Sequence, residues 1–373
     1  MDNRPASILR IVSYSLISLV ILLLIRQPSL VDPRLGAVSM MNFNAHKPFQ
    51  YRILIPAAVD AVNFVIPDII KHKIENIAKP YIERKAENCT EPELKAKYYV
   101  VSENIVRILI YFILNFLVLL GFLIVIRKLL IHFKCLSPHL ASLCPITFVF
   151  IMPIFFEFPN YIYDFAHLFL FTAGLYFLFT RSWLLYFIAF TLGVLNKETA
   201  AMLTVIYAFA YYKELEKSGF YKLLAGQVAI FGLIKFILFL IFRNNPGSIV
   251  EFHLMHNLGV ITNWRNLFRF EPLAGGFFLP SRINIIYPRG INLPLLVLVI
   301  FLSAYGWRRK PLLLRKSTIY FPLLICVALT MGSVPELRAY YDVLPITFLL
   351  GVMGVNLIWK DIKEKLTGGI NVG

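Results

Sequence analysis

Charged residues are scarce in this chain of 373 residues. Asp, Glu, Lys and Arg together make up 16% of the sequence, whereas soluble domains carry about 25%. Hydrophobic residues make up 58%, and the mean hydropathy is +0.71. A deficit of charge on this scale excludes an ordinary soluble domain and predicts many apolar membrane spans instead of a single anchor.

Cysteine is also scarce, and no internal repeat is visible. The four cysteines are Cys89, Cys135, Cys144 and Cys326. None belongs to a Cys-x-x-Cys pair or to a Cys/His spacing that binds zinc. His253 and His256 are three residues apart, but no third ligand is evident near them. The sequence therefore predicts no metal and no other cofactor.

Acidic residues are outnumbered by basic ones. The chain has 37 Lys and Arg but only 21 Asp and Glu, which gives a formal net charge of +16. In a soluble protein such an excess indicates nucleic-acid binding. Here the basic residues lie in loops that flank apolar runs, where they orient membrane spans and contact anionic lipid headgroups. We therefore expect membrane lipids as partners and no nucleic acid.

Apolar runs are abundant, and they predict an all-α polytopic membrane protein with about ten transmembrane helices. Runs of about 20 apolar residues are long enough to cross a bilayer. The predicted spans are 8–25, 104–126, 143–157, 163–180, 182–195, 199–212, 220–242, 291–306, 318–334 and 342–358. The whole chain, residues 1–373, forms a single transmembrane domain in this prediction.

The distribution of Lys and Arg sets the orientation of these spans. Basic residues are concentrated in the segments on one side, as at Arg308, Arg309 and Lys310. The short loops on the other side hold only Lys197 and Arg338. Because cytoplasmic loops carry the excess of Lys and Arg, we expect a multi-pass protein of the cell's inner (plasma) membrane with both termini in the cytoplasm.

Two long loops lie on the outer side in this topology. The first, residues 27–103, contains a mixed apolar stretch at 51–70, which we interpret as a helix lying in the membrane interface. The highly charged part, 71–97, is typical of a solvated helix. The second outer loop, residues 243–290, contains five arginines.

Three acid/base clusters interrupt the apolar sequence. They are Asn196-Lys197-Glu198-Thr199, Tyr161-Ile162-Tyr163-Asp164 and Glu336-Leu337-Arg338. Charged residues beside membrane spans are expensive to bury and are usually paired or functional. In the predicted topology all three clusters lie at the outer face, together with Asp32 and Arg52. We therefore expect an outward-facing cavity lined by carboxylates and cations, with structural ion pairs as the alternative.

Three short strings carry a resemblance to a known class of enzymes. They are Tyr51-Arg52-Ile53-Leu54-Ile55-Pro56, Leu195-Asn196-Lys197-Glu198-Thr199-Ala200 and Glu336-Leu337-Arg338-Ala339-Tyr340. With these strings and a long first outer loop, residues 8–358 resemble the GT-C class of membrane glycosyltransferases. The resemblance implies interfacial helices in that loop and sugar transfer from a polyprenyl-phosphate carrier to a glycan or lipid acceptor at the outer face. The lipid-linked sugar is then the donor substrate, and no divalent metal is indicated.

The chain departs from the better-known branches of this class in its first outer loop. It has no Asp-x-Asp or Glu-Asp pair there, and the candidate is the lone Asp32. A carboxylate within hydrogen-bond reach of the acceptor hydroxyl serves as general base. We therefore predict Asp32 as the catalytic base, with Asp164 and Glu198 as the alternatives.

The departing phosphate requires cations near it. Arg52, Lys197 and Arg338 are predicted to hold it, because Arg presents a planar fork to phosphate and Lys a point charge. Tyr51, next to Arg52, belongs with the predicted substrate-binding residues. Glu336, and Glu198 if it is not the base, would orient these cations as ion-pair partners.

Two other functions remain open at this point. A transporter or flippase of a lipid-linked or anionic substrate would also carry charges inside apolar sequence, although such proteins often contain twofold repeats. A polysaccharide polymerase or ligase would use the same lipid-linked donors. The arginines in the loop at 243–290 suit that third function.

Overall fold

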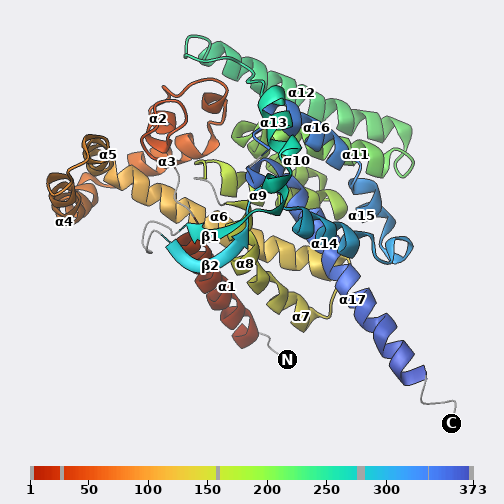
Figure 1. Cartoon of the computed structure of the whole chain (residues 1–373). Coiled ribbons are helices and arrows are strands. Elements are labelled where there is room, and N and C mark those ends of the chain that lie inside the picture. The colour runs from red at the N-terminus through yellow and green to blue at the C-terminus, as the bar shows by residue number, and fades with distance from the viewer. Residues whose placement is uncertain (1–3, 26–28, 157–159, 275–281, 335, 369–373) are drawn as a thin grey trace.

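The computed structural model describes residues 4–25, 29–156, 160–274, 282–334 and 336–368. These residues form a bundle of helices of unequal length, from which a pair of helices stands out at the left of Figure 1. The first helix, α1 (Arg4–Leu24), and the last, α17 (Leu344–Gly368), have their free ends at the lower side of the bundle in this view (Figure 1).

Within the described residues, six helical stretches are long and apolar enough to cross a membrane. Three of them are the continuous helices α1, α6 (Ile105–His132) and α12 (Lys217–Ile241). The others are built from consecutive shorter helices: α7 (Pro138–Leu143), η2 (Cys144–Thr147) and α8 (Phe148–Phe155); α15 (Leu312–Ser317) and α16 (Tyr320–Met331); and η6 (Leu337–Val343) with α17. Helices suit lipid because they satisfy every backbone hydrogen bond internally. This is the organisation of a helical membrane protein, as predicted.

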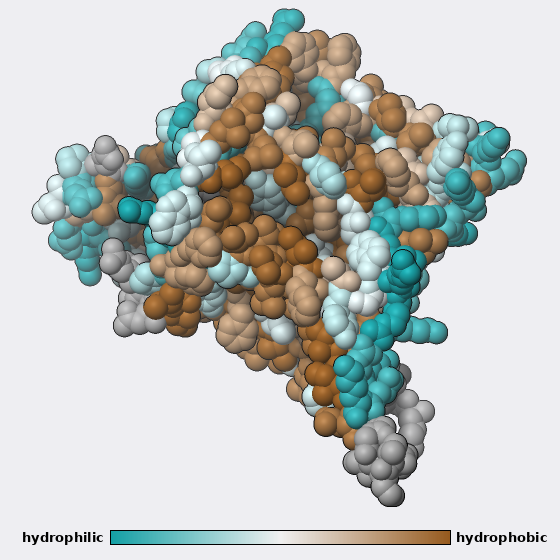
Figure 2. All heavy atoms as spheres, turned by 45° about the vertical axis from the view of Figure 1, so that its right-hand side comes forward, coloured by the Kyte–Doolittle hydropathy of each residue, from teal (hydrophilic) through white to brown (hydrophobic). Residues whose placement is uncertain are grey.

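The surface has the polarity that such a protein requires. Figure 2 shows apolar residues covering the middle of one face, while hydrophilic residues lie toward its margins. The outer side of α12 is an example, with Leu233, Phe236 and Ile241 all exposed. Exposed apolar side chains in this number would be costly in water, but they are stable against lipid acyl chains.

Four shorter apolar helices coincide with the remaining predicted spans. They are α9 (Asp164–Phe179), α10 (Trp183–Asn196), η3 (Glu198–Ala201) continued by α11 (Met202–Tyr211), and α14 (Leu293–Ala304). Helix α9 is buried along almost its whole length. A short helix enclosed by other helices ends inside the protein, so irregular backbone and polar side chains beyond its ends are sheltered from lipid.

The main core lies where α6, α9, α10, α11 and α17 meet. Two glycines permit close helix contacts there and at its edge. A Cβ on Gly174 of α9 would lie 2.6 Å from Leu203 Cδ1 of α11, and a Cβ on Gly354 of α17 would overlap the carbonyl oxygen of Leu302 in α14. Because small residues let membrane helices approach closely, a larger residue at Gly354 would separate α14 from α17.

The first long loop is largely helical. It contains α2 (Ala37–Met41), η1 (Phe49–Tyr51), α3 (Leu54–Val65), α4 (Asp68–Glu87) and α5 (Pro92–Glu103). Helices α4 and α5 form the pair that stands away from the bundle (Figure 1), and they correspond to the solvated helix predicted at 71–97. Helix α3 covers most of the stretch that was interpreted as interfacial, and Phe64 and Val65 at its end are strongly exposed.

The second long loop contains the one departure from an all-helical fold within the described residues. Helix α13 (Leu254–Thr262) and η4 (Trp264–Phe268) lead into strands β1 (Phe270–Ala274) and β2 (Arg282–Pro288). The strands pair antiparallel, with an irregularity between Pro272 and Leu273. The alternation in Arg282–Pro288 is short, and the apolar runs on either side of the loop dominated the sequence prediction. After the hairpin and α14, the short η5 (Trp307–Arg309) precedes α15.

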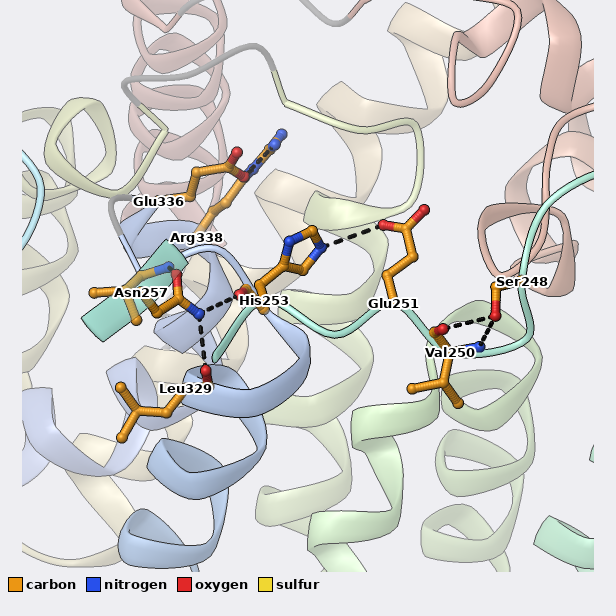
Figure 3. Close-up of polar contacts among 10 residues, drawn as sticks. Ser248, Val250, Glu251, His253, Asn257, Leu329, Glu336 and Arg338 are labelled. Carbon is orange, nitrogen blue, oxygen red and sulfur yellow. Dashed lines mark hydrogen bonds and ion pairs between the residues drawn. The ribbon is translucent and has the colours of Figure 1, made fainter. Parts of the chain in front are cut away.

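The two long loops are joined to each other and to the end of α16. The Lys47 N–H donates to Pro246 O over 2.8 Å, which ties the beginning of the second loop to the first. Eleven residues after Pro246, Asn257 donates to the carbonyls of Leu329 and Gly332 and accepts from the Val334 N–H (Figure 3). Residues 243–257, called the connecting segment below, therefore run from the first loop to the turn that precedes η6.

Candidate functional site

Four places where the chain leaves regular helix come together in the interior. They are the turn around Arg52, the approach to α9, the break between α10 and η3, and the turn that leads into η6. The Ile53 N–H donates to Leu195 O over 3.0 Å, and the Asn196 side chain donates to Tyr163 O over 2.8 Å. The charged cluster formed there consists of Arg52, Tyr161, Tyr163, Asp164, His167, Lys197, Glu198, Glu336, Arg338, Tyr341 and Asp342.

Arg52 and Glu198 form a two-point ion pair. Arg52 Nε donates to Glu198 Oε2 over 3.3 Å, and Arg52 Nη2 donates to Oε1. The remaining nitrogen, Nη1, donates to the Tyr163 hydroxyl, and Arg52 Cζ lies 4.3 Å from the centre of the Tyr163 ring. Burial disfavours the charge of Arg52, but the Glu198 carboxylate and Tyr163 outweigh it and raise the pKa of Arg52 above its usual value. Arg52 is therefore fixed in both charge and orientation.

Glu198 is the part of this pair that reaches water. Its side chain is 41% exposed, whereas that of Arg52 is 10% exposed. A further cation, Lys235 of α12, donates from its Nζ to the carbonyl oxygen of Val194 in α10 over 3.2 Å. A substrate approaching Arg52 would thus meet the Glu198 carboxylate first.

Lys197 is held by Tyr341 and, through it, by Asp164. Lys197 Nζ donates to the Tyr341 hydroxyl over 3.0 Å and lies 4.2 Å from the centre of its ring. The hydroxyl in turn donates to Asp164 Oδ1 over 3.2 Å. Burial lowers the pKa of Lys197, while Asp342 and Asp164 act in the opposite direction. Lys197 is a buried cation whose counter-charges are supplied by two aspartates.

Asp164 is poorly placed to act as a base. Its Oδ2 accepts the Tyr161 N–H over 2.8 Å and its Oδ1 accepts from Tyr341. The residue is 1% exposed. Because both oxygens are occupied and no surface is open to an acceptor, Asp164 holds the start of α9 and the Tyr341 hydroxyl in place.

A second buried pair lies one turn along α9. His167 Nε2 is 2.8 Å from Asp342 Oδ1, and both side chains are fully buried. The same nitrogen is 3.1 Å from Thr199 Oγ1. The pair therefore joins α9, η3 and η6 at a point that water does not reach.

Arg338 is paired with Glu336 and stacked on an aromatic ring. Its Nε donates to Glu336 Oε2 over 2.7 Å, and its Nη2 contacts the same oxygen. Its Cζ lies 3.6 Å from the centre of the Tyr161 ring, a cation–π contact. Figure 3 shows the two charged side chains running together beyond the end of α16.

A comparison with family models, curated proteins and solved structures finds no match.

The structure brings together most of the predicted site residues. Arg52, Asp164, Lys197, Glu198, Glu336 and Arg338 all belong to the charged cluster. Asp32 has other neighbours: its Oδ1 accepts the Arg34 N–H over 2.7 Å, and Arg34 Nε lies 3.8 Å away. Among the residues that the structure describes, no hydrogen bond or ion pair joins Asp32 to the cluster.

Tyr51 also lies apart from the charges. It packs with Leu238 and Phe242 on α12, and its buried hydroxyl has no hydrogen-bond partner within the described part of the chain. Its place next to Arg52 in the sequence does not bring its hydroxyl to the guanidinium, because the side chains of consecutive residues in a turn diverge.

Sequence reasoning missed three members of the cluster as site residues: His167, Tyr341 and Asp342. A signal for two of them is present. His167 follows Asp164 by three residues and Asp342 follows Arg338 by four, so each is one helical turn from a residue that was singled out. Nothing in the sequence distinguishes Tyr341 as a site residue, since tyrosine is common at the ends of membrane helices.

A cleft of about 180 Å³ lies between α13, η4, the residues that follow β2 and the residues after α16. Its lining includes His256, Arg269, Arg289 and Val334. None of the lining residues belongs to the charged cluster. No group of three or more His, Cys, Asp or Glu that could hold a metal ion is found among the described residues.

Proposed function

We propose that this protein is a membrane glycosyltransferase that moves a sugar from a polyprenyl-phosphate donor to a glycan or lipid acceptor at the outer face. The observation that carries the proposal is the convergence of Arg52, Lys197 and Arg338. They come from three distant segments, yet all three are buried in one cluster. Fixed cations in a site with little water stabilise a departing phosphate strongly.

The reaction assigns a role to each kind of group. The acceptor oxygen forms a bond to the sugar C1, the bond from C1 to the phosphate oxygen breaks, and the acceptor proton passes to a carboxylate. The polyprenyl phosphate leaves with the bonding electron pair, and the cations balance its charge. Asp32 and Glu198 remain the candidates for the carboxylate base, and Glu198 has the advantage of lying inside the cluster.

The activity can be tested with purified protein and a radiolabelled polyprenyl-phosphate sugar. We expect release of a glycosylated product by the wild type and a rate about 100-fold lower for Arg52→Gln, Lys197→Met and Arg338→Gln. Arg309→Gln, which removes an arginine paired with Asp361 outside the cluster, is the matched control and should transfer normally. Absence of transfer by the wild type, together with movement of the substrate across vesicles, would replace the enzyme with a transporter.

The transporter remains the second candidate because of one observation. His167 and Asp342 form a fully buried pair between apolar helices, and buried ionisable pairs of this kind also occur along the ion pathways of transporters. Transfer without vesicle uptake favours the enzyme, and uptake without transfer favours the transporter.

The proposal includes a topology of ten membrane segments, with the charged cluster at the outer face and both termini in the cytoplasm. The common side on which the free ends of α1 and α17 lie supports it (Figure 1). Single cysteines placed at Glu336 and at Lys360, in a background without native cysteine, test the topology. An impermeant maleimide should label position 336 in intact cells and position 360 only after permeabilisation. Labelling in the reverse order would invert the topology and reject the outer-face site.

A further inference from the structure

Every cation of the charged cluster already has an anionic or polar partner within the protein. Arg52 is paired with Glu198, Arg338 with Glu336, and Lys197 with the Tyr341 hydroxyl that donates to Asp164. An anionic substrate would therefore meet cations that internal groups neutralise. Binding requires that at least one of these partners give way.

The charge count leads to the same conclusion. The three cationic side chains of the charged cluster, those of Arg52, Lys197 and Arg338, lie among four carboxylates, those of Asp164, Glu198, Glu336 and Asp342. A phosphate added to these groups would increase the negative charge in an environment of low dielectric constant. Such an increase is costly, and the cost falls if one carboxylate turns toward water when the phosphate enters.

Three of the four carboxylates are held too firmly to leave. Asp164 and Asp342 are 1% and 0% exposed, and each contacts groups on other helices. Glu198 engages Arg52 through both of its oxygens. Releasing any of them would break contacts between distant segments.

Glu336 has fewer contacts than any of these three carboxylates. It contacts Arg338 through Oε2 alone, and no described residue bonds its Oε1. It is only two residues from Arg338, in the turn before η6, and its side chain is 25% exposed. Rotation of Glu336 toward water therefore breaks one local pair and no contact between helices.

Arg338 would stay in place when Glu336 leaves. Its guanidinium lies flat against Tyr161, with Cζ 3.6 Å from the ring centre, and the residue is 5% exposed. The Tyr161 backbone is fixed by its N–H bond to Asp164. A guanidinium held in this manner offers a phosphate a fork that needs little further ordering.

We propose that Glu336 is an exchangeable counter-ion of Arg338, and that the phosphate monoester headgroup of an isoprenoid lipid takes its place. The inference rests on the proposed function. It specifies that the donor binds by displacing Glu336 from Arg338. Glu336 occupies the phosphate position in the free protein and turns to water in the complex. It thus competes with the substrate, in contrast to Glu198, which orients Arg52.

Binding of polyprenyl phosphate to protein in nanodiscs of neutral lipid tests the exchange. Glu336→Gln removes the competing charge and should bind about five-fold more tightly than the wild type, since a partly exposed ion pair is worth about that factor. Glu198→Gln should bind more weakly, because Arg52 loses its orientation. Glu83→Gln on α4, whose carboxylate lies 3.9 Å from Lys79, is the matched control and should bind like the wild type.

The sign of the Glu336→Gln effect decides between the two roles of this carboxylate. Weaker or unchanged binding, in a variant that elutes and unfolds like the wild type, would overturn the exchange and make Glu336 an orienting partner of Arg338. No binding of polyprenyl phosphate by either protein would overturn it as well. Inorganic phosphate is titrated in parallel, and equally tight binding of it would reject the lipid headgroup as the ligand.

The outcome is separable from that of the proposed function. If Glu336→Gln binds the lipid phosphate more tightly but the wild type transfers no sugar, the exchange of Glu336 is supported and the glycosyltransferase function is rejected. If the wild type transfers sugar but the variant binds the lipid phosphate no more tightly, the glycosyltransferase function is supported and the exchange of Glu336 is rejected.

Discussion

Lys197 Nζ lies 3.0 Å from the Tyr341 hydroxyl, although 144 positions separate the two residues in the chain. The same hydroxyl donates to Asp164 over 3.2 Å. One tyrosine thus connects the break after α10, the beginning of α9 and the turn of η6. Because both bonds meet at the same hydroxyl oxygen, that single oxygen bridges the ammonium of Lys197 and the carboxylate of Asp164.

Removing this hydroxyl should loosen the cluster. Tyr341→Phe keeps the ring against Lys197 but leaves a buried ammonium and a buried carboxylate each one bond short, at a cost of about 1–3 kcal/mol. We expect a lower unfolding temperature in detergent and reduced transfer. Tyr340→Phe, at the adjacent half-buried position, is the control with the same chemical change. Equal unfolding temperatures for the two variants would show that the Tyr341 hydroxyl is not a structural link.

The pair of Arg52 and Glu198 should show strong energetic coupling. Arg52→Gln leaves the carboxylate without its two donors, and Glu198→Gln leaves a buried guanidinium with a neutral partner. The double variant removes both charges, so its loss of stability should be smaller than the sum of the single losses by about 1–3 kcal/mol. Unfolding in mixed detergent, measured for all four proteins, gives this difference. Additive losses would mean that the two side chains act independently.

The connecting segment should depend on Asn257. This buried side chain makes three hydrogen bonds to the end of α16 and the residues after it. Asn257→Ala should cost about 2 kcal/mol or more, and limited proteolysis should then cleave the loop at 243–290 faster. Asn266→Ala, which loses a single bond to Val260 O, serves as the control. Identical cleavage patterns would argue that the hairpin and α13 hold the loop without Asn257.

Lys310 should make stability depend on alkaline pH. Its Nζ donates to the carbonyls of Leu302, Ser303 and Leu350, and burial lowers its pKa from 10.5 to about 8. Between these values the unfolded chain keeps the proton that the folded protein has released, so stability rises with pH through this window. The gain from about pH 8 to about pH 9.5 is roughly 2 kcal/mol. Lys310→Met should lack this rise, and parallel pH profiles of unfolding temperature for the two proteins would contradict the assignment.

Much of the fold could be predicted from the sequence. Each predicted span coincides with an apolar helix or a pair of consecutive helices, as 104–126 does with α6. The hairpin of β1 and β2 was missed because its strands are short and their pattern is weak beside the long apolar runs. The number of segments that cross the bilayer remains a prediction, since six stretches reach the necessary length within the described residues.

The site was predictable in part, for a reason that its residues make clear. Lys197, Glu198 and Arg338 are conspicuous because charge inside apolar sequence is costly wherever the chain folds. Asp32 was chosen by its position after the first span, and the structure gives it Arg34 as its neighbour. His167 and Tyr341 were passed over, because a histidine or a tyrosine in an apolar run acquires a role only from the partner that packs against it.

The sequence by itself determined that this is a helical membrane protein and that a few charges had to be sheltered, because hydropathy and the cost of burying charge are properties of local composition. Only the tertiary structure decided which charges meet. Hydropathy specifies that α9 and α10 are apolar helices, but the rotation and depth of each helix depend on side-chain packing, such as that of Gly174 against Leu203. That packing places Lys197 on Tyr341, His167 on Asp342 and Arg338 on Tyr161.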